Sequence, residues 1–455
     1  HWTAYHSTTG TERLRLNTTE AKDEAGFWAT PPTSTDFYVS NPDVNTIGVT
    51  YVAYLFAHND GDGEFGPDGD QDIIKCGSYT GTGAAGNFID LGFEPQWLMT
   101  KRVDSEGNGW VMQDSMRSMS HSDYRWLSAN TGSAESSSAQ SSGTPGGTAA
   151  VYPTGYMINN TGGGNNSSGA KYIYIAIRRG PMGAPESGSE VYNAATYTGN
   201  GSSKTVSAGI VPDMILGHHL GGRGGVPMVS TRVQGHGLWL VSSNNASEIQ
   251  YTYMYSPSFD GTAGTTTIPT ASGEVNASGV SHAMHFFKRA HNFLDVLTYE
   301  GTASSGNPQT VSHNLGVVPK MMWVKCRDTA KDWQVYHTDL GISKKLILNS
   351  DSAELSAGVG AWNTAPTATS FTVGDDSEFS GGGRAYIAYL FASLDNVSKV
   401  GSFSHTSGSP TNVDCGFTNG ARFVLWKKYS NTDGWQVYDT TRGIVSGSDP
   451  FLQLN

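Results

Sequence analysis

The densest group of side chains that could do chemistry is a run of carboxylates in the first fifth of the chain. Six acidic residues fall within thirteen positions: Asp60, Asp62, Glu64, Asp68, Asp70 and Asp72. Hard oxygen ligands at this density suit Ca²⁺. The run does not match an EF-hand loop, because Phe65 stands where that loop needs glycine and Gln71 where it needs a bidentate glutamate. Two interpretations stay open, a looser calcium site and a solvated flexible linker.

Two tryptophans in matching stretches form a second group. Trp28 and Trp362 open segments of the same character, residues 28–39 and 362–373, which share 7 of 12 positions and are rich in Thr and Pro. An aromatic face with nearby Asn, Asp and Thr donors suits saccharide binding, so both tryptophans are candidate ligand-binding residues. The alternative is that each indole covers the hydrophobic core beneath it.

A third pattern places a carboxylate three residues before a guanidinium, in Asp114 with Arg117 and in Asp439 with Arg442. We interpret both as turns that an ion pair and an Asp side-chain cap hold together. The chain has no glycine-rich phosphate loop, His/Cys metal cluster, nucleophile elbow or recurring carboxylate pair. We therefore predict that the protein is not an enzyme. Release of reducing ends from a polysaccharide would show otherwise.

All these residues lie in a chain that repeats. One strand-like apolar run occurs four times, at residues 51–57, 172–178, 282–288 and 386–392. A repeat of roughly 100 residues is too long for a solenoid unit and suits an independently folding domain. The sequence therefore predicts a tandem array of modules, each with its own core. We expect residues 51–57 and 386–392 to be central strands, buried on at least one face.

Other landmarks keep the same order in each copy. A mostly Pro-led apolar strand precedes a Trp-led strand, and a Leu-x-x-Asn or Leu-x-Leu-Asn element follows. The Trp-led strands begin at Trp2, Trp110, Trp333 and Trp435, and Pro227 takes this place in the third copy. We expect Trp110, Trp333 and Trp435 to lie in the cores. The Pro-led strands end at Lys101, His218, Lys325 and Lys427, for which we expect a solvated rim or an ion pair with a loop carboxylate.

The phase of these landmarks predicts the domain boundaries. Complete modules are expected at residues 67–180 (the second module), 181–290 (the third, divergent module) and 291–397 (the fourth module). Residues 1–66 form an N-terminal half-module that carries the second half of the repeat, and residues 398–455 form a C-terminal half-module that carries the first half. Because both ends fall inside a module, we expect the chain to be a segment of a longer polypeptide.

Composition favours short strands joined by turns. Gly numbers 57, Pro 18, and aromatic residues make up 11% of the chain. The predicted fold class is all-β, with tandem β-sandwich domains of about 105 residues that resemble jelly-roll or lectin-like folds. Apolar stretches are only about seven residues long, so we expect no membrane insertion.

Charge argues against a nucleic-acid partner. The chain has 28 basic and 40 acidic residues, a formal net charge of −12, and basic residues do not gather into a long cluster. We predict no cofactor other than the candidate calcium ion.

The pattern resembles an uncharacterised tandem β-repeat module in virion proteins of tailed bacteriophages, of the marine and cyanobacterial phage type. Residues 90–101, residues 110–117, the Leu-x-x-Asn element and the run at residues 386–392 carry the resemblance, which extends over nearly the whole chain. It implies a tail-fibre-like protein at the virion surface, in an extracellular setting, with other virion subunits (as a homo-oligomer) and a host-surface glycan or receptor as partners. The expected function is host adhesion. The alternative is a structural role as a capsid decoration, fibre shaft or filament subunit.

Overall fold

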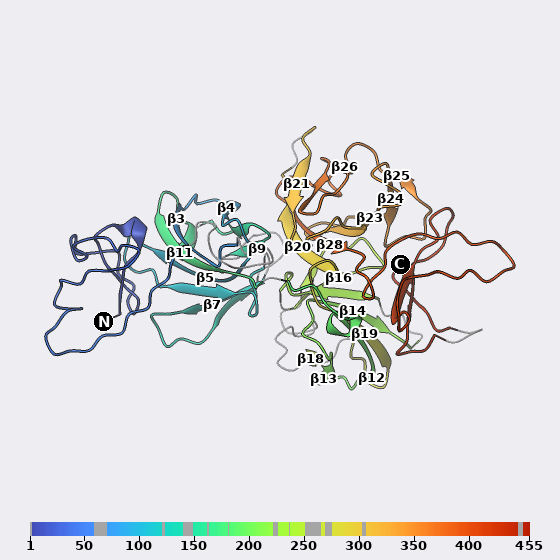
Figure 1. The fold of residues 1–455 in the computed structure, drawn as a ribbon, viewed down its shortest axis with the longest axis horizontal. Coiled ribbons are helices and arrows are strands. Elements are labelled where there is room, and N and C mark those ends of the chain that lie inside the picture. Colours follow the sequence, from blue (N-terminus) through green and yellow to red (C-terminus); the bar gives the residue numbers. More distant parts are fainter. Residues whose placement is uncertain are drawn as a thin grey trace. The chain divides into compact units, whose positions relative to one another are not determined.

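The computed structural model describes residues 2–58, 71–120, 123–139, 149–161, 163–180, 182–221, 226–235, 237–250, 265–268, 275–302, 306–444 and 449–455 (Figure 1). The chain forms two compact units, His1–Pro181 and Met182–Asn455. Antiparallel sheets dominate both units, which confirms the prediction of an all-β, multi-domain sandwich fold. Within the described residues, no helix has the length and apolar character needed to cross a bilayer.

The second module is a sandwich of two antiparallel sheets. The large sheet has the order β3 (Ile74–Thr80), β11 (Lys171–Arg178), β5 (Pro95–Arg102), β6 (Val111–Asp114), β7 (Asp123–Ser128) and β8 (Ser136–Ala139). The small sheet has the order β4 (Asn87–Asp90), β10 (Gly155–Ile158) and β9 (Ala150–Tyr152). One short helix, α1 (Gly163–Asn166), precedes β11.

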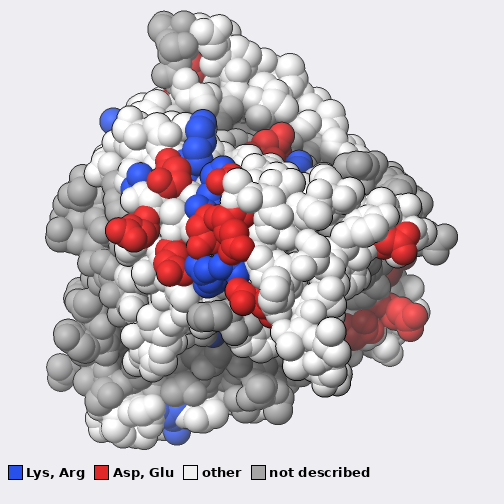
Figure 2. Space-filling view, turned by 90° about the vertical axis from the view of Figure 1, so that its left-hand side faces the viewer, with Lys and Arg blue, Asp and Glu red and all other residues white. Residues whose placement is uncertain are grey.

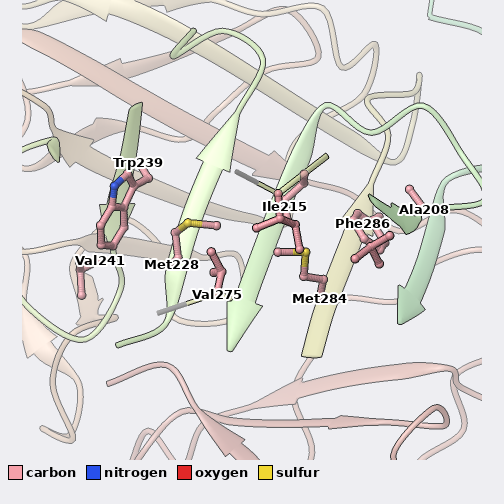
Figure 3. Packing of buried hydrophobic residues seen from close by; sticks show 10 residues of the cluster. Ala208, Ile215, Met228, Trp239, Val241, Val275, Met284 and Phe286 are labelled. Atoms are coloured by element: carbon pink, nitrogen blue, oxygen red, sulfur yellow. The ribbon is translucent and has the colours of Figure 1, made fainter. Parts of the chain in front are cut away.

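The third module repeats this plan. Its large sheet has the order β12 (Tyr192–Thr198), β19 (Ser281–Phe287), β14 (Met214–His219), β15 (Met228–Thr231), β16 (Leu238–Val241) and β17 (Ile249–Gln250). Its small sheet pairs β13 (Lys204–Ser207) with β18 (Thr265–Ile268), and the 3₁₀ turn η2 (Gly188–Glu190) precedes β12. The ten buried residues of its core, most of them labelled in Figure 3, all come from this module and include Val206, Ile215, Ile268 and Phe286.

The fourth module has the same two sheets. The large one has the order β20 (Leu294–Glu300), β28 (Ala385–Phe391), β22 (Met321–Cys326), β23 (Gln334–His337), β24 (Lys344–Ile347) and β25 (Leu355–Ser356). The small one has the order β21 (Gln309–Ser312), β27 (Ser370–Val373) and β26 (Trp362–Thr364). The predicted module boundaries near residues 180, 290 and 397 fall between the strands of successive sheets.

The half-modules contain fewer strands. In the N-terminal half-module, β1 (Thr3–Ala4) pairs with β2 (Leu14–Arg15), and the 3₁₀ turn η1 (Ser7–Thr9) lies between them. In the C-terminal half-module, β29 (Phe423–Trp426), β30 (Gln436–Asp439) and β31 (Leu452–Gln453) form one sheet.

The central strand of each large sheet is buried on both faces. Residues 386–390 in β28 have no exposed area, as predicted. Tyr386 stacks on Tyr299, which meets Phe371 of the small sheet, so this face belongs to the core. Tyr389 points to the opposite face, because successive side chains alternate, and there it meets Trp333. We call this opposite side the outer face of the large sheet.

The prediction of a buried strand at residues 51–57 is wrong. These residues form no strand, and Tyr51, Val52 and Leu55 are 45%, 74% and 74% exposed. In the fourth module the matching strand β28 lies between β20, which is the first strand of the module, and the Pro-led strand β22. Among the described residues 2–58 neither of those strands occurs, so residues 51–57 have no ladder partners there that would order them.

Candidate functional site at the module junctions

Three of the Trp-led strands place their indole against the module before them in the chain. Trp110 Nε1 donates a hydrogen bond to the Arg15 carbonyl, Trp333 Nε1 to that of Val241 and Trp435 Nε1 to that of Ile347, each at 2.9 Å. Each acceptor lies two or three residues before the Asn of the Leu-x-x-Asn element. The three indoles are at most 4% exposed. The same kind of contact therefore recurs at three junctions: a buried indole ring whose N–H group has a hydrogen-bond acceptor.

The Asn of the Leu-x-x-Asn element fixes the start of the Trp-led strand. The side-chain oxygens of Asn130, Asn349 and Asn455 accept hydrogen bonds from the backbone N–H groups of Trp110, Trp333 and Trp435, at 2.9, 2.8 and 2.6 Å. Asn17 does the same for Trp2 at 3.2 Å. The element thus positions the tryptophan of its own module while its neighbouring carbonyl receives the tryptophan of the next one.

The lysine that ends each Pro-led strand also reaches across a junction. Lys101 Nζ lies 3.3 Å from the Thr19 carbonyl oxygen, and Lys325 Nζ lies 3.4 Å from that of Asn245. These two lysines are 1% and 0% exposed, so the expectation of a solvated rim is wrong for both. Burial removes the ammonium group from water and lowers the pKa of each to about 8. Lys427 donates likewise to the Asp351 carbonyl at 2.8 Å.

Backbone pairing completes these junctions. The N–H of Lys22 bonds the Val103 carbonyl at 3.0 Å, that of Glu248 the Arg327 carbonyl at 2.7 Å, and that of Glu354 the Tyr429 carbonyl at 2.8 Å. At the junction of the third and fourth modules, Arg327 also makes a bidentate contact with Glu248, at 2.9 and 2.8 Å. Both side chains of this pair are buried. At these three junctions, which all lie within one unit or the other, the modules are joined by side-chain and main-chain bonds together.

A fourth junction joins the third module to the C-terminal half-module. Ser242 Oγ donates to the Leu454 carbonyl at 2.8 Å, and Arg422 donates to the carbonyl of Tyr192 at 3.2 Å. Phe423 meets the ring of His285 at 5.3 Å. Since the fourth module contacts both the third module and the C-terminal half-module, the three modules of Met182–Asn455 close a ring of contacts.

Buried histidines replace the usual contacts at this fourth junction. His285 Nε2 lies 3.8 Å from Asp439 Oδ2, and Asp439 is paired with Arg442 at 2.5 Å. Burial lowers the pKa of His285 to about 3 and that of His218 well below its ordinary value. Both imidazoles are therefore neutral at pH 7, and Arg442 is the ionic partner of Asp439. The predicted Asp–Arg turns are confirmed, because Asp114 and Arg117 make the matching pair.

A cavity of about 870 Å³ lies at the same junction. Its lining includes Tyr197, His219, Pro227, Arg442, Phe451 and Gln453. Pro227 holds the position of the docking tryptophan, and Gln453 corresponds to Val241 and Ile347, whose carbonyls receive an indole at the other junctions. The space therefore lies where those junctions place a buried ring. Aromatic rings, hydroxyl groups and one guanidinium line it, which suits a small polar ligand.

Trp28 and Trp362 lie in equivalent places, and both are buried. They are 8% and 3% exposed. Trp28 packs edge-on against Tyr5 at 5.7 Å, and Trp362 against Tyr336 at 5.6 Å. Stacking on a sugar ring requires an accessible indole face, and neither residue offers one. Each indole instead covers the core of its own module, which is the alternative that the sequence left open.

Only one of the six predicted calcium ligands lies among the described residues. Asp60, Asp62, Glu64, Asp68 and Asp70 lie outside the described residues. Asp72 is described, and its carbonyl accepts a hydrogen bond from Arg178 Nε at 2.7 Å. In the part of the chain that the structure describes, no group of three or more His, Cys, Asp or Glu side chains is placed to hold a metal ion. Calcium binding stays a prediction.

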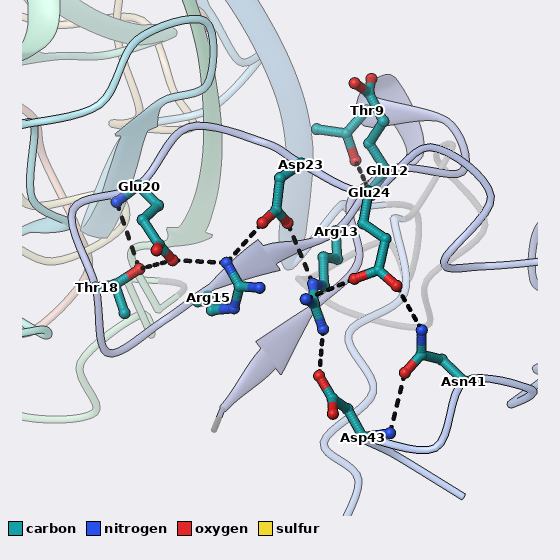
Figure 4. Close-up of polar contacts among 10 residues, drawn as sticks. All are labelled: Thr9, Glu12, Arg13, Arg15, Thr18, Glu20, Asp23, Glu24, Asn41 and Asp43. Carbon is teal, nitrogen blue, oxygen red and sulfur yellow. Dashed lines mark hydrogen bonds and ion pairs between the residues drawn. The ribbon is translucent and has the colours of Figure 1, made fainter.

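A network of ion pairs in the N-terminal half-module escaped sequence analysis. Arg13 contacts Asp23 at 3.1 Å, Glu24 at 2.5 Å and Asp43 at 2.6 Å (Figure 4). Arg15 adds a contact with Asp23 at 2.7 Å. On the face that Figure 2 shows, acidic and basic side chains are interspersed and do not form a patch of one sign. Such a mixture holds loops together and offers little attraction for a polyanion.

The sequence pattern identifies the junction residues but not their role. Trp, Lys and Asn recur in phase, which predicted a structural role, and no pattern indicated that they act between modules. The signal that could have revealed it was the joint loss of Trp and Lys in the third module, where Pro227 and His218 take their places. Residues that change together in one copy are candidates for one shared contact.

Comparison with known proteins gives a family. The model of a family described as a domain of unknown function (DUF7483) matches residues 1–181 and 288–454. No curated protein matches the chain. The matched residues cover both half-modules and the second and fourth modules, and they leave out most of the divergent third module. Because the match extends over well more than half of its length, the chain belongs to the DUF7483 family.

Proposed function

We propose that the protein is a non-enzymatic structural component of a virion surface, in which docked β modules build a stiff array. The observation that carries the proposal is the hydrogen bond from a buried indole to a main-chain carbonyl, made with the same length at three junctions. Flexibly tethered domains have no need for such a contact. A shaft or decoration that must keep its shape does need one.

The chemistry of the repeated residues supports a structural role. The repeated Trp and Lys side chains bond the preceding module, and the repeated Asn holds its own Trp-led strand. None of these contacts brings a nucleophile and a base together. The repetition thus multiplies an interface, as expected of a chain that builds length.

The virion setting is supported by the sequence resemblance to tailed-phage proteins. In this proposal the partners are neighbouring virion subunits, including further copies of the chain, and the location is extracellular. Antibodies raised against residues 182–455 should decorate intact particles in electron micrographs. Labelling confined to cell lysate, with particles unlabelled, would contradict the virion location.

Stiffness is tested by unfolding and by distance measurement. Residues 182–455 should unfold in one cooperative transition, because each module shares buried contacts with the other two. Spin labels at exposed positions of the third and fourth modules should give one narrow distance distribution, which Trp333→Ala should broaden. Trp362→Phe is the matched control, since this indole is buried inside its own module. Independent transitions and a broad distribution in the unaltered protein would refute the proposal.

Host-surface adhesion is a second proposal, and the cavity at the fourth junction favours it. Phe451 is 49% exposed there, beside Tyr197 and Arg442. Rings and hydrogen-bond donors in one depression suit a saccharide. Phe451→Ala should then lower adsorption to host cells while Phe88→Ala, an exposed ring on β4, should not. Equal adsorption by both variants would contradict the proposal that this cavity mediates adhesion.

A further inference from the structure

Two histidines lie inside the junction between the third module and the C-terminal half-module. His285 of β19 is 0% exposed and His218 of β14 is 4% exposed, and their rings meet edge-on at 5.9 Å. Both side chains point from the outer face of the large sheet, where Phe423 of the C-terminal half-module lies 5.3 Å from the ring of His285. Neither imidazole belongs to the core of the third module, so their burial depends on the contact between the two modules.

The charged groups around these histidines already carry an excess of positive charge. From the C-terminal half-module, Asp439 and Arg442 face His285, and the guanidinium group of Arg422 lies over the ring of Tyr192 at 5.5 Å. From the third module, the hydroxyl group of Tyr192 lies 3.1 Å from His285 Nδ1. This tyrosine is uncharged at neutral pH, because burial raises its pKa. Two guanidinium groups and one carboxylate therefore surround the site before either histidine takes up a proton.

The carboxylate that faces the histidines is already paired. Asp439 accepts a hydrogen bond from the main-chain N–H of Arg442 at 2.9 Å and another from Arg442 Nε at 2.5 Å. A proton on His285 Nε2, 3.8 Å from this carboxylate, has to compete with Arg442 for it. A second proton on His218 then places two imidazolium groups next to each other in a site from which water is excluded. The closed junction therefore opposes protonation of both rings.

We propose that the junction between the third module and the C-terminal half-module is an acid-sensitive contact, which is closed at neutral pH and opens when His218 and His285 become protonated. Opening exposes both imidazoles to water, which solvates their positive charges. The C-terminal half-module is then held by the fourth module alone, through Trp435 and Lys427. The inference rests on the proposed stiff array and adds the condition under which its ring of contacts opens.

The direction of the effect follows from which state binds protons. Burial lowers the pKa of His285 to about 3 and that of His218 well below 6.5, so both rings stay neutral in the closed junction at pH values where exposed histidines become charged. Closing is therefore fully favourable above pH 6.5 and weakens as the pH falls from 6.5 towards 3. Each histidine shifts the equilibrium towards opening by up to about tenfold per pH unit.

The junction of the third and fourth modules provides an internal reference. Its contacts are the Trp333 hydrogen bond, the Lys325 contact and the buried pair of Arg327 and Glu248, and no histidine takes part in them. Lowering the pH from 7.5 to 5.0 should leave this junction closed. A change confined to the other junction can then be assigned to its histidines.

The test measures two distances in the full chain. Spin labels on non-natural side chains, which avoid labelling the three cysteines, are placed at exposed positions. Labels at Thr205 and Lys428 report on the third module and the C-terminal half-module, and labels at Thr205 and Thr310 report on the third and fourth modules. The distance distribution between Thr205 and Lys428 should be narrow at pH 7.5 and broad at pH 5.0, whereas that between Thr205 and Thr310 should stay narrow. Circular dichroism should show that the sheets persist at both pH values.

Variants assign the effect to the two histidines. With His218→Gln and His285→Phe together, the distribution between Thr205 and Lys428 should stay narrow at pH 5.0, because neither residue can then take up a proton. His405→Phe is the matched control, since it alters an exposed histidine of the same half-module, and it should leave the broadening unchanged. If the double variant does not fold, the unaltered protein alone decides the outcome.

Three results would overturn the inference. These are a distribution between Thr205 and Lys428 that stays narrow at pH 5.0 in the unaltered protein, equal broadening in the folded double variant, and loss of the sheets over the same pH range. Failure of the proposed function is a different result, because it would appear at pH 7.5 as a broad distribution between Thr205 and Thr310.

Discussion

Residues 1–181 and residues 182–455 carry the same junction parts in different surroundings. In the second unit Trp333, the Asp439 turn and the run at residues 386–392 are buried, whereas Trp2, the Asp114 turn and residues 51–57 in the first unit are more exposed. The residue types match, so side-chain chemistry alone does not decide burial. Burial depends on the neighbouring strands and modules. The matching residues have these neighbours in the second unit and lack them in the first.

The strongest test of this difference in burial introduces the same charged residue into each of the two matching runs. Leu390 is 0% exposed and Leu55, its counterpart, is 74% exposed. Leu390→Asp should destabilise the fourth module by more than about 4 kcal/mol, because an unpaired carboxylate enters its core. Leu55→Asp should change stability by less than about 0.5 kcal/mol. Urea unfolding of the full chain measures both, and similar losses would contradict the assignment of burial.

Truncating the docking tryptophan gives the next largest difference. Trp333→Ala should lower the free energy of unfolding of residues 182–455 by about 3–5 kcal/mol, since a buried ring and a junction hydrogen bond are lost together. Trp2→Ala in residues 1–181 should cost less than about 1 kcal/mol. Thermal unfolding of the two units, each with its variant, makes the comparison. An equal cost in both units would mean that Trp2 is already docked.

Lowering the pH should change the stabilities of the two units to different extents, and this difference should be smaller than those above. His218 and His285 have folded pKa values below the ordinary 6.5, so below pH 6.5 the unfolded chain takes up protons that the folded chain does not. Residues 182–455 should then lose up to about 1.4 kcal/mol per pH unit for each histidine. Among the described histidines of residues 1–181, only His6 has a lowered pKa. Unfolding between pH 7 and pH 5 measures the slopes, and His285→Phe should flatten that of the second unit.

Raising the pH should have the smallest effect, and it should stabilise both units. Lys101 and Lys325 have pKa values of about 8 in the folded chain and an ordinary value of 10.5, so between these limits the unfolded chain binds the extra proton. Stability should therefore rise with pH above 8, by at most about 1.4 kcal/mol per pH unit for each lysine. Measurements up to pH 9.5 avoid tyrosine ionisation. Lys325→Met should abolish the rise that Lys325 contributes in the second unit, and an unchanged slope would contradict the burial of this ammonium group.

Periodicity was enough to predict the class of fold. Alternating apolar runs and frequent turns predicted short strands, and the recurrence of residues 386–392 in phase with other landmarks predicted repeated sandwiches. The same reasoning failed for residues 51–57, because a strand needs ladder partners and a local pattern does not reveal whether they exist. Lys101 and Lys325 were misplaced for a related reason: a lysine is rarely buried, and only the adjacent module removes these two from water.

The candidate site was predicted less well than the fold. Trp28 and Trp362 were recognised as equivalent, and the packing of Tyr5 and Tyr336 against them bears this out. Their burial depends on side chains brought from the Trp-led strand, which the spacing of residues does not reveal. The cavity beside Pro227 was beyond prediction, since a hollow at an interface follows from how two modules meet.

The acceptor of the docking indole is a main-chain carbonyl, supplied in turn by Arg15, Val241 and Ile347. Every residue has such a carbonyl, so that hydrogen bond makes no demand on the side chain of the accepting residue. After gene duplication the accepting position can drift freely as long as the donor keeps its tryptophan. Recombination can also exchange modules without rebuilding this bond. Because this contact requires a particular side chain from only one of the two modules, long arrays can evolve from a single ancestral module.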